Sequence, residues 1–292
     1  VNYQFEGLND SLELEPQEAN YAFFNPKMGL TYLLKNNTFY GVFAIGTREP
    51  VRNDFRDNKT SSRPEHESME NVELGYRYAN GRKRVNINFY NMWYNNQLVL
   101  TGAVNDVGDP IRTNVKSSRR RGVELDFQYP ITDKLQAGGN LTLSENKIAK
   151  FTEYLGEWDG TYSIIEKEYS NTDIAFSPNT IAAAMLSYKA NKYFTINASG
   201  KYVGQQYLDN TQNDARSLDA FTNVDLSINY LSTVVKGTKN LNVGLFLNNV
   251  LNQYYAPNGY TFSGIIGGER QDFNYLYPMA GFNWMMKVSM TL

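Results

Sequence analysis

The sequence RVNINFYNMWYNNQLVLTG at residues 84–102, followed after a Gly- and Asp-containing segment by RRRGVELDFQY at residues 119–129, decides the fold class. In the second segment Val123, Leu125 and Phe127 alternate with Glu124 and other polar residues. Successive side chains of a β-strand point to opposite faces, so this alternation predicts a strand with one apolar and one polar face. Together the segments predict a strand, a loop and a return strand.

The same alternation recurs to the end of the chain, and is most regular in the last segment. It predicts about eleven full strands and one partial strand at the start, with every second connection short and the others long and polar. The strands are expected at 1–7 (partial), 21–35, 38–47, 71–79, 84–102, 119–129, 134–149, 180–189, 193–207, 224–230, 241–247 and 282–292, and the long loops at 48–69, 102–118, 150–178 and 251–277.

Alternating short turns and long loops are typical of outer-membrane β-barrels, which have short periplasmic turns and longer extracellular loops. Aromatic residues are expected near both strand ends of such a barrel, at the levels of the lipid headgroups. The sequence places them there, with Tyr76, Tyr78, Tyr129, Tyr188, Tyr193 and Tyr230 near short turns and Trp93, Tyr94, Tyr202 and Tyr207 near long loops.

Composition excludes several function classes. A net charge of -2 argues against a nucleic-acid-binding protein, which would carry a basic surface. The chain has no cysteine, so disulfide scaffolds and thiolate metal sites are excluded. Mean hydropathy is -0.51, which is compatible with a transmembrane barrel because only half of each strand faces lipid. The chain begins at Val1 without an apolar leader, and we expect a fragment or a matured product.

The polar faces of the predicted strands carry charges that a dry core would not tolerate. We expect these side chains to line a wet lumen and to contact a plug inside it. They are Glu73, Arg77, Glu124, Asp126, Lys201, Asp225 and Lys287.

Several short segments, in order along the chain, resemble TonB-dependent outer-membrane receptors of the Bacteroidetes type. Each segment is short, and it is their ordered occurrence over nearly the whole chain that is specific. They are FNPKMGLTY at 24–32, REP at 48–50 with Asp54 and Phe55, ELGY at 73–76, NQLVLTG at 96–102, NDVG at 105–108, DIAFSP at 173–178, QYLDNT at 206–211, NNVLN at 248–252 and NGY at 258–260.

This resemblance implies an all-β, transmembrane antiparallel β-barrel of 22 strands with a plugged lumen. Residues 1–292 would be the C-terminal part of its barrel, about 11 to 12 strands. The implied partners are the missing N-terminal plug and barrel half, the TonB complex, outer-membrane lipid and lipopolysaccharide, and a small nutrient. The implied function is import of a scarce nutrient, with a ferric siderophore or similar iron complex first and cobalamin or an oligosaccharide behind it. The family commonly ends in an aromatic residue, whereas this chain ends in Leu292.

Two predicted long loops are rich in aromatic residues, and one of them contains an arginine. Aromatic and arginine side chains dominate molecular recognition, so these loops are the expected ligand contacts of a receptor. The candidates are Tyr154, Trp158 and Tyr162 in one loop, and Tyr255, Tyr260, Phe262 and Arg270 in the other.

Enzymatic and metal chemistry find little support. His66 is the only histidine, in a polar loop, which excludes a two-histidine metal site and disfavours a hydrolase triad. The acidic segment at 105–109 lacks the spacing of a calcium loop and is expected to form a turn. We therefore expect no catalytic residue, no metal and no cofactor.

Two details of the opening segment lead to further expectations. Alternation places Arg119 and Arg121 outward and Arg120 inward, where the outward pair would contact lipopolysaccharide phosphates or form a solvated strand end. Asn91 shares a face with Phe89 and Trp93, so we expect a β-bulge or register shift there.

Two other classes of function remain open. One is a self-contained outer-membrane barrel of about twelve strands, acting as an adhesin, a pore or a lipid enzyme, which predicts closure between residues 1–7 and 282–292. The other is a soluble carbohydrate-binding β-domain, which would be recovered without detergent.

Overall fold

The computed structural model describes residues 2–8, 14–57, 63–105, 107–157, 162–232 and 240–291. Eleven strands follow one another in hydrogen-bonded order β18-β15-β14-β11-β10-β8-β7-β6-β5-β4-β3. Their bounds are β3 Lys27–Leu34, β4 Asn37–Arg48, β5 Glu67–Asn80, β6 Lys83–Val104, β7 Pro110–Pro130, β8 Leu135–Glu157, β10 Thr180–Lys189, β11 Phe194–Val203, β14 Phe221–Ser232, β15 Asn240–Asn248 and β18 Asn283–Thr291.

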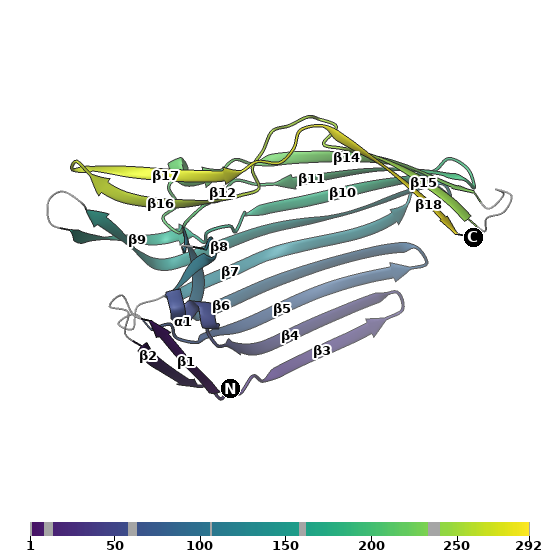
Figure 1. Ribbon diagram of the computed structural model, residues 1–292. Helices are drawn as coiled ribbons and strands as arrows, with labels where there is room; N and C mark the ends of the chain where they lie inside the picture. The colour runs from purple at the N-terminus through teal and green to yellow at the C-terminus, as the bar shows by residue number, and fades with distance from the viewer. Residues whose placement is uncertain are drawn as a thin grey trace.

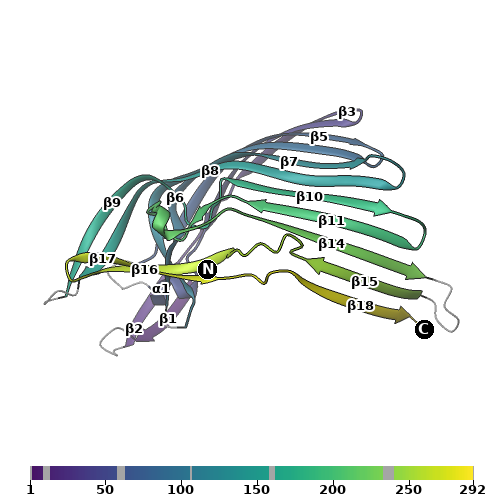
Figure 2. The ribbon, with the colours of Figure 1, turned by 90° about the horizontal axis from the view of Figure 1, so that it is seen from above.

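Neighbouring strands on this path are antiparallel, and the sheet curves without closing (Figures 1 and 2). In the part of the chain that the structure describes, β3 pairs only with β4 and β18 only with β15. The prediction of eleven antiparallel barrel strands is therefore confirmed, and the barrel is open between β3 and β18. No described helix is long and apolar enough to cross a membrane.

The smaller elements lie outside this path. β9 Ser163–Asp173 and β16 Asn258–Ile266 pair with β8, and β17 Glu269–Tyr277 pairs with β16. β12 Gln206–Tyr207 and β13 Ser217–Leu218 form a small sheet around the 3-10 helix η2 Asp214–Arg216, and α1 Arg52–Asp57 lies between β4 and β5. β1 Asn2–Leu8 and β2 Leu14–Asn20 form a separate two-stranded sheet.

The first strand differs from its prediction. Residues 1–7 were expected to be part of a barrel strand, but β1 pairs with β2, which lies between the first two predicted strands. Closure between residues 1–7 and 282–292, which a self-contained barrel requires, is therefore wrong.

Three of the four predicted long loops also differ from expectation. Residues 102–118, 150–178 and 251–277 contain long strand extensions or complete hairpins: β6 with β7, β8 with β9, and β16 with β17. These hairpins lie at one end of the sheet, called here the long-loop end, and the short turns lie at the other, the short-turn end (Figures 1 and 2). The sequence alternates at residues 260–277, although this segment was predicted to be a loop. Two strands can form there outside the main sheet, because they satisfy their backbone hydrogen bonds by pairing with each other.

The register gives the sheet two chemically different faces. One face, called here the outer face, carries apolar side chains that lie in rows across the strands, such as the exposed Leu74, Phe89 and Leu143 with the half-buried Val123 between them. At the short-turn end of this face lie Tyr76, Tyr78, Tyr129, Tyr188 and Tyr230, and towards the other end lie Trp93 and Tyr202. Tyr94, in contrast, falls on the inner face.

Asn91 shows that the predicted β-bulge is wrong. The register runs without interruption through Asn91, which faces Val72 on one side and Arg121 on the other. The irregularity of this strand pair lies further on, between Leu100 and Val104. Asn91 therefore lies on the outer face in a regular ladder.

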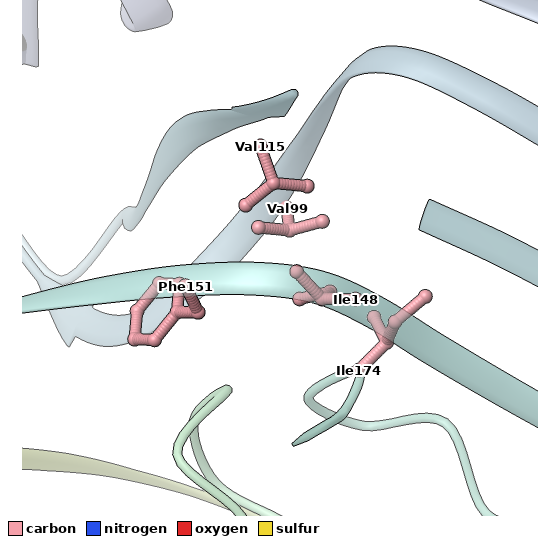
Figure 3. Packing of buried hydrophobic residues seen from close by; sticks show 5 residues of the cluster. All are labelled: Val99, Val115, Ile148, Phe151 and Ile174. Atoms are coloured by element: carbon pink, nitrogen blue, oxygen red, sulfur yellow. The ribbon is translucent and has the colours of Figure 1, made fainter. Parts of the chain in front are cut away.

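A buried cluster joins the barrel strands to the long-loop end. Val99 of β6, Val115 of β7 and Ile148 and Phe151 of β8 pack with Ile174, which follows β9 (Figure 3). The buried positions of β8 change phase between Ile148 and Phe151, so that Phe151, Glu153 and Leu155 continue the buried face. This cluster fixes the direction in which the β8–β9 hairpin leaves the sheet.

Candidate ligand-binding site

Three segments of the chain meet at the long-loop end. They are the extension of β8, the segment 206–218 that contains η2, and the β16–β17 hairpin, and β16 pairs in parallel with β8 at Gly264 and Gly156. Both ribbon views show β16 and β17 near this end of the molecule (Figures 1 and 2). Side chains from all three segments converge on one buried ion-pair network.

Arg216 is the centre of this network. Its side chain is only 2% exposed and its Nη1 lies 2.8 Å from Glu153 Oε1. It also forms an ion pair with Asp209, and its guanidinium donates to Ser263 Oγ of β16 and Thr211 Oγ1. A buried guanidinium is stable only when its donors are paired, so Arg216 requires all three segments to stay together.

Arg270 of β17 completes the network. Its Nη2 lies 2.7 Å from Glu153 Oε1, and its Nε lies 2.8 Å from Asp272. Tyr169 of β9 donates its hydroxyl hydrogen to the other oxygen of Glu153, so β9 is connected as well. The predicted ligand contact Arg270 therefore uses its guanidinium to hold the hairpin on β8.

Burial and pairing act in opposite directions on these acids. Burial acts to raise the pKa of Glu153, but hydrogen bonds from Arg270 and Arg216 outweigh it and leave that pKa lowered. Asp272 behaves in the same way, with burial opposed by Ser263 and Arg270 and a net lowered pKa. In Asp209, burial outweighs the charge of Arg216 and raises the pKa.

The opposite face of the β16–β17 hairpin carries an aromatic ladder, defined here as Tyr260, Phe262, Phe273, Tyr275 and Tyr277. The rings of Phe262 and Phe273 stack with centroids 4.9 Å apart, as do those of Tyr260 and Tyr275. Tyr277 lies 6.1 Å from Tyr260. Four of these residues are between 38% and 53% exposed, so the hairpin presents a partly exposed apolar platform on one face while its other face is held by ion pairs.

The predicted ligand residues do not gather in one place. Tyr260 and Phe262 lie together in the aromatic ladder, whereas Tyr255 stacks on Phe221 with centroids 4.2 Å apart. Tyr154 is 65% exposed on the face of β8 opposite to Glu153, and Tyr162 is exposed immediately before β9. Trp158 lies outside the described residues.

Sequence reasoning missed the partners that hold this site. Arg216, Asp209 and Glu153 were not selected, and neither were Phe273 and Tyr275 of the ladder. The alternation of Phe273, Tyr275 and Tyr277 was a usable signal for the ladder. Nothing in the sequence relates Glu153 to Arg216, because their contact depends on the packing of separate segments.

The seven charged residues predicted to face a lumen occupy one face of the sheet. The register places Glu73, Arg77, Glu124, Asp126, Lys201, Asp225 and Lys287 opposite to the apolar outer face. A cavity of about 440 Å³ opens on this inner face, and Asp126, Lys201 and Asp225 line it. Asn88 and Arg77 also interact here, with Glu124 and with the ring of Tyr40.

Comparison with known families identifies the chain. The model of the "TonB dependent receptor-like, beta-barrel" family matches residues 2–250. The chain belongs to this family. The predicted resemblance is confirmed, and the sheet is part of an outer-membrane receptor barrel. No curated protein matches the sequence.

Solved structures agree with this receptor-barrel fold. The siderophore receptor PiuA from Acinetobacter baumannii has a TM-score of 0.69 at 18% identity, covering 96% of this chain and 37% of that one. The ferric yersiniabactin uptake receptor FyuA from Yersinia pestis has a TM-score of 0.63 at 14% identity, covering 98% and 40%. The copper transporter OprC has a TM-score of 0.61 at 15% identity, covering 96% and 41%. The chain thus spans well under half the length of these proteins.

In a receptor barrel, short turns face the periplasm and long loops face outward, so the long-loop end is the extracellular end. The ion-pair network and the aromatic ladder of this receptor barrel are therefore extracellular. The acidic segment at 105–109 forms a turn there, in which Asn105 Oδ1 accepts hydrogen bonds from the amides of Val107 and Asp109.

His66 does not take part in a charged site. Its ring contacts those of Tyr21 and Phe23, with centroids 6.2 and 5.2 Å away. Within the described ranges, no group of three His, Asp or Glu side chains is arranged to hold a metal ion. This receptor family is a transport family, not an enzyme family.

Proposed function

We propose that residues 1–292 are the C-terminal part of a receptor barrel that imports a scarce nutrient across the outer membrane with TonB-coupled energy. The preferred cargo is a ferric siderophore or similar iron complex. The family match supports nutrient uptake, and of the neighbours reported above one is described as a siderophore receptor and another as a ferric yersiniabactin uptake receptor. The plug, the TonB contact and the other half of the barrel belong to the parts of the receptor that lie outside residues 1–292.

The observation that carries the binding role is the aromatic ladder at the extracellular end. Five rings on a rigid hairpin offer a preorganised apolar surface, and the opposite face of that hairpin is held by Arg216 and Arg270. Rigid aromatic platforms lose little conformational entropy on binding. Tyr260 and Phe262 remain proposed ligand contacts on this basis, with Phe273 and Tyr275 added to them.

The other predicted residues have different roles in this proposal: ligand contact, support of the site, or lining of the lumen. Tyr154 and Tyr162 are exposed and remain proposed contacts for a large ligand. Tyr255 and Arg270 serve as supports for the site. The seven charged residues of the inner face are proposed to line a wet lumen and to contact the plug, since water and plug side chains together satisfy charges that a dry core would not.

Binding of defined cargoes to the purified full-length receptor tests this proposal. Ferric catecholate, ferric hydroxamate, cupric ion, cobalamin and a malto-oligosaccharide are titrated separately, with tryptophan fluorescence as the readout. The expected result is saturable binding of one iron complex, and uptake of the same labelled complex by cells in a TonB-dependent manner. Binding of cobalamin, sugar or copper alone would refute the iron assignment.

The role of the ladder is tested with Phe262→Ala combined with Tyr275→Ala. Alanine truncation of a dominant aromatic contact commonly costs about 2 kcal/mol, so a loss in affinity of roughly thirtyfold is expected. Phe194→Ala is the matched control, because Phe194 is an exposed aromatic residue of the outer face near the short-turn end. Equal affinity of the double variant and the control would exclude the ladder from ligand binding.

A further inference from the structure

A small group of polar side chains interrupts the apolar outer face of the sheet. We call it the outer polar patch and define it as Asn91, Arg119, Arg121 and Glu145. Arg119 Nη2 lies 2.6 Å from Glu145 Oε1, and Arg121 Nη2 lies 2.7 Å from Glu145 Oε2. One carboxylate thus binds two guanidinium groups, and the triad keeps one net positive charge.

The intervening arginine behaves differently. Arg120 points to the inner face, where its guanidinium donates to Asn146 and Ser177. Arg119 and Arg121, by contrast, are 43% and 53% exposed. The run of three arginines is therefore not a uniformly solvated strand end, since alternation delivers two of them to the lipid-facing side.

The patch lies at the extracellular margin of the apolar face. Across the strands, the row below it is Leu74, Phe89, Val123 and Leu143, and Trp93 is the register partner of Arg119. Tyr129, at the short-turn end of β7, lies eight residues from Arg121 and ten from Arg119. At about 3.4 Å per residue and a tilt of about 40°, these positions are roughly 20 and 26 Å above Tyr129, where an apolar band about 25 Å tall ends.

Donors remain free in this patch. Among the described residues, Arg119 and Arg121 have no polar partner other than Glu145, so Arg119 Nη1 and Arg121 Nε and Nη1 are unused. Asn91 lies beside Arg121 in the register, but its Oδ1 is a buried acceptor and adds no donor for an anionic ligand. Unpaired polar groups at the edge of a lipid bilayer are costly unless a headgroup satisfies them.

Of the neighbouring charges, those of Lys147 and Asp173 cancel, and Glu70 lies one strand beyond Trp93, away from the triad. Lys147, the register partner of Arg119, is paired with Asp173 at 2.8 Å. Glu70, the register partner of Trp93, lies on the far side of that ring from Arg119.

We propose that Arg119 and Arg121, which share the carboxylate of Glu145, bind the phosphate group of a lipid A molecule in the outer leaflet. A phosphate is the complementary ligand, because guanidinium groups bind it through paired, charge-assisted hydrogen bonds. The acyl chains of the same lipid would cover the apolar row of Phe89 and Val123 below. The proposal rests on the outer-membrane location of the barrel and is independent of the cargo.

Native mass spectrometry of the purified full-length receptor tests the site. The receptor is delipidated in detergent and titrated separately with bisphosphorylated lipid A, dephosphorylated lipid A and inorganic phosphate. For the wild type, retention of bisphosphorylated lipid A at least about tenfold above the dephosphorylated form is expected, since charge-assisted hydrogen bonds are involved. Inorganic phosphate alone should not bind measurably, and its binding at equal strength would point to a free anion site instead of a lipid site.

Two variants with opposite expectations keep the test decisive. Arg119→Gln combined with Arg121→Gln should lose the preference for phosphorylated lipid A, whereas Glu145→Gln should retain or increase it, because it removes the competing carboxylate. Arg82→Gln, in the short turn after β5, is the matched control and should behave as the wild type. The proposal would be overturned if Glu145→Gln lost the lipid. It would also be overturned if the double arginine variant, shown to be folded by its heat-modifiable migration in gel electrophoresis, still bound phosphorylated lipid A preferentially.

Discussion

Removal of Arg216 is the most informative perturbation of the extracellular end. Arg216→Ala takes away the buried guanidinium that contacts Glu153, Asp209, Ser263 and Thr211. Arg270 still pairs with Glu153, but Asp209 is left with only its Thr211 hydrogen bonds and no cation. Breaking a buried ion pair from one side costs about 3 to 5 kcal/mol, because the remaining charge stays buried.

This cost should appear as local opening, since the eleven-stranded sheet does not depend on Arg216. A change of 3 kcal/mol corresponds to roughly 150-fold in the opening equilibrium, so amide hydrogens of β16 and β17 should exchange faster by at least about a hundredfold. Hydrogen–deuterium exchange with mass spectrometry of the full-length receptor measures this peptide by peptide. The strands β10 and β11, which carry no part of the network, provide the internal reference.

Two controls separate the ion pairs from the volume of the side chain. Arg216→Met retains most of the volume but none of the charge, and should open the hairpin almost as much as alanine. Arg82→Ala, in an exposed turn, should leave exchange unchanged. Unchanged exchange of residues 258–277 in Arg216→Ala would refute the view that the network holds the hairpin to β8.

Further predictions concern pH and backbone packing. Because the pKa values of Glu153 and Asp272 are lowered in the folded protein, their stabilisation is complete above the ordinary range of Glu and Asp and is lost as the pH falls through the lowered values. Protection of β16–β17 amides, corrected for intrinsic exchange rates, should therefore fall below about pH 4. Asp209, whose pKa is raised, gains stabilisation as the pH falls, so a loss near about pH 6 would contradict this origin. Gly75→Ala should lower the unfolding temperature of the barrel, because an added Cβ would lie 2.0 Å from the ring of Tyr40, and overpacking costs about 1 to 3 kcal/mol. Gly81→Asn is the control, because φ is 57° at Gly81, no atom lies near the added side chain, and asparagine tolerates this conformation. Unfolding temperatures are measured by heat-modifiability, and a comparable decrease in both variants would argue against the steric explanation.

Most of the fold was predictable because it rests on a local rule. Alternation with a period of two residues follows from strand geometry, and each strand carries it independently of its neighbours. Val123, Leu125 and Phe127 therefore indicated the outer face of β7 before any pairing was known. The same rule assigned the seven charged residues to the opposite face.

Local rules were less successful where strands leave the sheet. The hairpin β8–β9 has polar and aromatic residues on both faces, and β16–β17 has aromatic residues on one face and polar residues on the other, so both resembled loops in overall composition. Asn91 was expected to force a bulge because an amide on an apolar face is unfavourable. Its position beside Arg121, at the margin of the apolar band, makes a regular ladder possible without exposing it to the hydrocarbon centre.

The sequence by itself determined the class of this protein: an antiparallel barrel of about eleven strands, its two faces, the side with short turns and the receptor family. Each of these depends on residues that lie close together along the chain. Only the tertiary structure decided what Arg270 does, that Arg216 is buried between β8 and β16, and that Arg119 and Arg121 share Glu145. Glu153 and Arg216 are 63 residues apart, and their contact exists only because separate hairpins converge at one end of the sheet. The alternation of residues within a single strand does not predict contacts between separate hairpins.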